Sequence, residues 1–75
     1  MENTDLDALR DAYKAAVESW IAAIRREEDL ATPDHTVHAI DLWEHAGFAE
    51  EEARGQAKQA KKEYEDALRK VNFSF

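Results

Sequence analysis

Three side chains near the middle of the sequence have the types and spacing of a small metal site. His38, Asp41 and His45 recur at intervals of three and four residues, so a helix would carry them on one face. Two imidazoles and one carboxylate can hold zinc or ferrous iron. Helical di-iron proteins use Glu-x-x-His motifs instead, and no glutamate here has a histidine three positions later. We therefore expect no metal and no other cofactor, and a metal-binding bundle is an alternative hypothesis.

Two carboxylates fall on positions that the apolar pattern turns inward, Glu27 and Glu50. A buried carboxylate needs a partner. We expect Glu27 to lie near His35 or His38, and Glu50 to pair with Arg54 or with a second subunit. General acid or base chemistry also needs a pocket, which a seam of alanines does not provide. The sequence therefore predicts no catalytic residue and no enzyme.

Composition and charge limit the classes of partner that the chain is expected to bind. The net charge of −7 disfavours nucleic acid and anionic membranes, and the basic run Lys58, Lys61 and Lys62 lacks interleaved aromatic residues. The chain has no cysteine, its N-terminal segment has no signal-peptide pattern, and no apolar stretch approaches the ~20 residues that span a bilayer. We expect a cytoplasmic protein, in which the basic C-terminal region neutralises the acidic start of the first helix.

The N-terminal half predicts one amphipathic helix over about residues 5–31. Thr4 and Asp7 resemble a capping box at its start. Helical spacing gathers one apolar stripe on it. That stripe consists of Leu6, Leu9, Tyr13, Ala16, Val17, Trp20, Ala23, Ile24 and Leu30. Pro33 ends this helix and suits the first turn of the next one, with Thr32 as its N-cap.

A second helix is predicted over about residues 34–71, although Gly47 invites a break. Two series of residues keep a seven-residue period on both sides of this glycine without a change of phase. They are Ala39, Ala46, Ala53, Ala60 and Ala67, and Trp43, Glu50, Ala57, Tyr64 and Val71. An interrupted chain has no reason to resume in register, so we expect one helix that tolerates Gly47 at a cost of ~1 kcal/mol.

Together these elements predict an all-α fold with a single domain over residues 1–75: an antiparallel, coiled-coil-like hairpin. Its seam is predicted to consist of Tyr13, Trp20, Ile24, Ala39, Trp43, Ala46, Ala53, Ala57, Ala60, Tyr64 and Ala67. Counting back from the turn places Trp20 opposite Ala46 and Gly47, with the glycine making room for the indole, and Tyr13 opposite Ala53. The longer second helix is then expected to project past the open end of the hairpin.

A hairpin of this size buries little apolar surface. Even a compact protein of this length buries only about 60% of its unfolded surface, and the chain has no disulfide to compensate. We therefore expect a homodimer, a four-helix bundle in which the second hairpin also covers Phe48, a residue off the seam.

The C-terminal residues alternate in polarity, with Phe73 and Phe75 on either side of Ser74. Alternation predicts an extended segment. These rings either close the dimer or form a docking peptide for another protein. The function expected from the whole sequence is association: an adaptor or regulator that binds itself and a protein partner of unknown identity.

Overall fold

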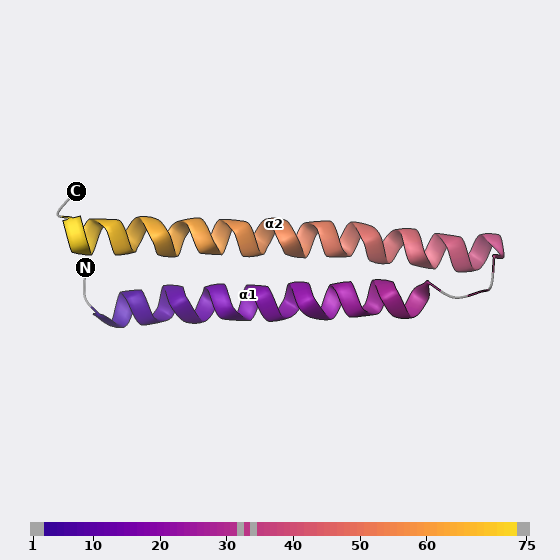
Figure 1. The fold of residues 1–75 in the computed structure, drawn as a ribbon, viewed down its shortest axis with the longest axis horizontal. Helices are drawn as coiled ribbons and strands as arrows, with labels where there is room; N and C mark the ends of the chain where they lie inside the picture. The colour runs from indigo at the N-terminus through magenta and orange to yellow at the C-terminus, as the bar shows by residue number, and fades with distance from the viewer. Residues whose placement is uncertain (1–2, 32, 34, 74–75) are drawn as a thin grey trace.

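The computed structural model of the chain describes residues 3–31, 33 and 35–73, and it is an antiparallel pair of helices. Helix α1 spans Asn3–Leu30 and helix α2 spans Val37–Phe73. The two helices pack against each other along their length, and the start of α1 lies beside the end of α2 (Figure 1). The predicted all-α hairpin is confirmed.

Helix α2 passes through Gly47 without a break, as the uninterrupted seven-residue period predicts. The glycine is an ordinary helical residue there, with no left-handed backbone conformation. Thirty-seven residues at ~1.5 Å per residue give ~55 Å. The molecule measures 56 Å along its longest axis, so α2 alone sets its length.

The helix ends differ from the predicted ranges 5–31 and 34–71. Helix α1 already includes Asn3 and Thr4, so Thr4 is not an N-cap. Pro33 lies in a bend of the connection rather than in the first turn of α2, and the predicted cap Thr32 is outside the described residues.

The cap of α2 is Thr36. Its side-chain Oγ1 accepts a hydrogen bond of 3.2 Å from the backbone N–H of Ala39, and its carbonyl oxygen accepts one of 3.0 Å from the N–H of Ile40. A hydroxyl three positions before an unpaired N–H is the ordinary N-cap arrangement. Helix α2 therefore starts three residues later than Pro33 predicts.

The two helices are also offset differently from the prediction. Helix α2 extends past α1 at both ends, and further at the end that carries the connection (Figure 1). The predicted projection of α2 past the open end is therefore present, but the greater part of the excess length lies at the end that carries the connection. The first turns of α2 thus lie beyond the end of α1 at Leu30.

The core of the hairpin is thin. Among the described side chains, Ala46, Ala57 and Ala67 are the buried apolar ones, and no large side chain is fully buried. Alanines at these positions let the two backbones approach closely, but each contributes little apolar area. In the part of the chain that the structure describes, neither helix is long and apolar enough to cross a membrane.

Candidate functional site

The strongest polar contact between the helices joins Trp20 of α1 to Glu50 of α2. The indole Nε1–H donates a hydrogen bond of 2.7 Å to Oε1 of the carboxylate, and both side chains are half-buried. A hydrogen bond to a charged acceptor is shorter and stronger than a neutral one. Glu50 is thus satisfied within the hairpin, and neither Arg54 nor a second subunit is required to pair with it.

This contact shows a register different from the predicted one. Trp20 reaches Glu50 rather than Ala46 and Gly47. Tyr13 stacks on Tyr64, with ring centroids 6.5 Å apart, rather than facing Ala53. Both partners lie further along α2 than predicted because the connection displaces the start of α2 beyond the end of α1.

Glu27 also has a different neighbour. Its Oε1 would lie 3.8 Å from a Cβ added at Gly47, so this carboxylate rests beside the glycine. His35 and His38, its predicted partners, are exposed. Gly47 therefore faces the end of a flexible acidic side chain and not the Trp20 ring.

The eleven predicted seam residues differ in burial. Three are buried: Ala46, Ala57 and Ala67. Seven are half-buried: Tyr13, Trp20, Ile24, Ala39, Ala53, Ala60 and Tyr64. Trp43 is 44% exposed and lines a hollow together with Ala31, the residue that follows α1.

The metal candidates His38, Asp41 and His45 are all exposed. Nδ1 of His45 lies 2.8 Å from the backbone carbonyl oxygen of Asp41. A carbonyl only accepts, so this nitrogen carries the proton and Nε2 remains as the possible ligand atom. Within the described residues, no three histidine, aspartate or glutamate side chains are placed to share one metal ion.

Five large apolar side chains in the first twelve residues of α2 are exposed. We call this group the apolar overhang. It consists of Val37, Ile40, Leu42, Trp43 and Phe48, whose exposure runs from 41% to 76%.

The described residues line hollows between the helices, and two of these bear on the site. The larger, about 470 Å³, is called the acidic hollow because three of its lining residues are glutamates; it is lined by Ile24, Glu27, Glu28, Ala31, Trp43 and Glu50. The smaller, about 250 Å³, is called the basic hollow; it is lined by Tyr13, Val17, Trp20, Ala57, Lys58 and Lys61. The Trp20–Glu50 hydrogen bond connects a residue of one hollow to a residue of the other.

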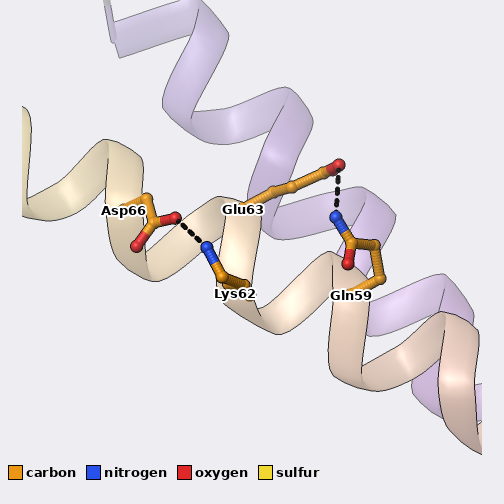
Figure 2. Close-up of polar contacts among 4 residues, drawn as sticks. All are labelled: Gln59, Lys62, Glu63 and Asp66. Atoms are coloured by element: carbon orange, nitrogen blue, oxygen red, sulfur yellow. Dashed lines mark hydrogen bonds and ion pairs between the residues drawn. The ribbon is translucent and has the colours of Figure 1, made fainter.

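Polar contacts on the outer side of α2 stay within that helix. Nζ of Lys62 lies 2.8 Å from the carboxylate of Asp66, and Gln59 donates a 3.2 Å hydrogen bond to Glu63 (Figure 2). The Lys62 ammonium lowers the pKa of Asp66, and the carboxylate raises the pKa of Lys62, chiefly through this hydrogen bond. These contacts follow the i, i+4 spacing that supports an exposed helix.

The ion pairs of the described residues also lie within one helix each. In α1, Arg10 approaches both Asp7 and Asp11 at 3.5 Å. The acidic start of α1 and the basic end of α2, which were predicted to neutralise each other, lie side by side. In the described part of the chain no direct ion pair joins them.

The predicted docking residues fall at the C-terminal end. Helix α2 continues through Phe73, so the extended segment predicted from Val71 onwards is wrong up to that residue. The ring of Phe73 and the whole of Phe75 lie outside the described part of the structure.

Most of the site residues share one signal, the seven-residue period. The Trp20–Glu50 pair carries no such signal as a pair, because its members are thirty residues apart and their contact depends on the helix offset. Comparisons of this chain with protein-family models, curated proteins and solved structures give no match.

Proposed function

We propose that this chain is a non-enzymatic cytoplasmic protein that acts by association, as a homodimeric adaptor or regulator built as a four-helix bundle. The observation that carries the proposal is the imbalance between buried and exposed apolar residues. Three alanines form the buried core of the described chain, while Ile21, Val71 and the five residues of the apolar overhang are more than 40% exposed. A small domain with so little core gains stability by covering such residues with another molecule.

The surface area supports the same proposal. The chain exposes 5874 Å², whereas the usual scaling for a compact monomer of its mass, 8.6 kDa, gives about 4,700 Å². By that scaling, two hairpins that merge into one compact body would each bury about 2,000 Å². Interfaces of this size belong to permanent homodimers.

The seam gives a reason to prefer association over catalysis. Glu50, its half-buried carboxylate on α2, already accepts the indole hydrogen bond of Trp20. Both hollows are open on the surface and are lined largely by apolar atoms. Shallow apolar hollows of this kind suit the side chains of a protein partner.

Co-purification of two differently tagged copies tests the proposal. We expect one tag to recover the other copy of the wild-type chain. Substitution of two overhang residues, Ile40→Ser and Trp43→Ser, should abolish this recovery because it removes apolar area from the interface. The matched control is Ala49→Ser, an exposed position on the same helix that lacks a large side chain.

The adaptor or regulator role needs a second readout from the same proteins. Mass spectrometry of the material captured by the wild-type chain and by the Ile40→Ser, Trp43→Ser variant should identify a protein retained only by the former. Circular dichroism establishes that the variant is still helical. Failure of the wild-type copies to recover each other contradicts the homodimer, and identical captured proteins for both chains contradict the role assigned to it.

A further inference from the structure

The acidic and basic hollows lie on the same face of the hairpin. On α1, Val17 lines the basic hollow and Ile24 lines the acidic one, seven residues later. On α2, Glu50 lines the acidic hollow and Ala57 lines the basic one, again at seven residues. Side chains seven apart on packed helices point to the same side, so both hollows open in one direction.

An apolar ridge separates the two hollows on α1. Ile21 is 42% exposed and lies four residues after Val17 and three before Ile24, a spacing that keeps all three on one face. The face thus offers an apolar centre between a glutamate-lined hollow and a lysine-lined hollow. Apolar centres with charged surroundings are typical of specific protein interfaces.

The charged side chains of the described residues are distributed in the same way as the two hollows, with the acidic excess on the side of the acidic hollow. Val17 and Ala57 line the same hollow, so they lie at the same level along the hairpin. A plane across the hairpin at this level divides the described residues into 18–56, towards the connection, and 3–17 with 57–73, at the opposite end. The first part carries nine carboxylates and three guanidinium groups, a net charge of −6. The second carries six carboxylates and seven basic side chains, a net charge of +1.

We propose that a second copy of this chain docks face to face on these hollows in antiparallel orientation, so that the acidic hollow of each hairpin covers the basic hollow of the other. This inference rests on the proposed self-association and adds its surface and its orientation. A two-fold axis through the ridge around Ile21 generates both hollow-to-hollow contacts at once, as an isologous interface requires. A parallel dimer would place the strongly acidic ends side by side, and like charges in an interface are costly.

The occupant is a second copy because the face is complementary to itself. It presents three glutamates at one hollow and two lysines at the other, so the same surface supplies both halves of the charge match. The apolar ridge and Trp43 then lie inside the interface. By the scaling used above, each hairpin would bury about 2,000 Å² in a compact dimer, which is the size of a permanent homodimer interface.

Charge reversal on one hollow at a time tests the proposal. One variant carries Lys58→Glu and Lys61→Glu, which makes both hollows acidic; the other carries Glu27→Lys and Glu28→Lys, which makes both basic. Each variant alone should self-associate with a Kd raised at least about tenfold over the wild type, because like charges now meet at both contacts. An equimolar mixture should regain wild-type affinity, since opposite charges then meet at both contacts.

The matched control carries Lys62→Glu and Lys70→Glu, the same change of charge at exposed positions of α2 that line neither hollow. Its Kd should stay within about threefold of the wild type, because screening weakens charges outside the interface. Glu27 is half-buried, so helical content is checked by circular dichroism. If the Glu27→Lys, Glu28→Lys variant does not fold, Glu28→Lys alone replaces it, and the mixture should then regain part of the lost affinity because two glutamates remain at that hollow.

Spin labels test the orientation directly. The chain has no cysteine, so His38→Cys gives one labelled site per copy near the connection. An antiparallel pair 56 Å long places the two labels roughly 45 to 50 Å apart, whereas a parallel pair places them within about 20 Å.

The outcomes separate this inference from the proposed function. A wild-type dimer with short label distances, or one that both charge reversals leave unchanged, overturns the docking surface and leaves self-association standing. A wild-type chain that stays monomeric overturns the self-association on which the surface depends. Weakened variants, a restored mixture and long label distances support the inference.

Discussion

The indole Nε1–H of Trp20 donates a 2.7 Å hydrogen bond to the carboxylate of Glu50, and this contact fixes the register of α1 against α2. Alanines along the seam are alike, so they tolerate several offsets of the helices. A carboxylate that accepts a hydrogen bond from one specific donor does not tolerate several offsets. The pair therefore specifies the register in a seam that is otherwise repetitive.

Trp20→Phe is expected to destabilise the protein by about 1 to 2 kcal/mol, because it removes the donor and leaves a half-buried carboxylate without its partner. Glu50→Gln should cost less, since the amide oxygen can still accept. Urea unfolding at a fixed protein concentration gives the free energies. A double-mutant cycle with Trp20→Phe and Glu50→Ala should show coupling, and strictly additive losses would contradict the role of the pair.

Gly47→Ala is expected to stabilise the protein by about 0.5 to 1 kcal/mol. An added Cβ would meet only the Oε1 of Glu27, at an ordinary contact distance of 3.8 Å, and alanine lowers the entropy of the unfolded chain. Gly55→Ala is the matched control, because nothing lies within 4 Å of its added Cβ. A loss of stability at Gly47 alone would show that this position needs more space than the hairpin indicates.

Ala67→Leu is expected to cost about 1 to 3 kcal/mol, because the position is 4% exposed and lines neither hollow, so the added carbons crowd the facing helix. Ala49→Leu, an exposed position on the same helix, should change the stability by no more than about 0.5 kcal/mol. Thermal unfolding of both variants measures the difference. Equal effects would mean that Ala67 is not a site of close helix packing.

The Lys62–Asp66 contact predicts a local pH dependence. The pKa of Asp66 lies below its ordinary value of 3.8, mainly because Lys62 donates a hydrogen bond to it. The contact therefore stabilises the folded protein above pH 3.8, and this contribution is lost as the pH falls through the lowered pKa. For Lys62, whose pKa is raised above 10.5, the contribution is present below that pH and is lost as the pH rises through the folded pKa.

A carbon-13 NMR titration of the Asp66 carboxyl measures this effect. Lys62→Met should raise the pKa of Asp66, whereas Lys61→Met, which removes a neighbouring ammonium that contacts Glu65 instead, should leave it in place. The same pKa in the wild type and in the Lys62→Met variant would contradict the hydrogen bond as its cause.

Seven-residue spacing was sufficient to predict the all-α hairpin and the continuity of α2 through Gly47, because residues on both sides of a glycine keep one helical phase only if the helix itself continues. The offset of the helices was not predictable in this way. It depends on the path of the connection and on the cap Thr36, which lacks the glutamate of a capping box three residues later, whereas Thr32 and Pro33 formed a more familiar start signal.

The polar neighbours in the seam were missed for the same reason. An error in the offset moves every cross-helix partner, so Glu50 was assigned to Arg54 or a second subunit when its partner is Trp20. The inward position of Glu27 followed from its place in the stripe, but its neighbour Gly47 did not. Periodicity indicates which side of its helix a residue occupies, and only the loop geometry determines which residue of the other helix lies opposite it.

The most direct test of self-association is the mass of the wild-type chain in solution, measured by sedimentation equilibrium at micromolar concentration. The exposed apolar overhang and the excess surface predict a dimer of about 17 kDa, twice the 8.6 kDa of one chain. A folded, helical protein that sediments at 8.6 kDa throughout that range would contradict the account.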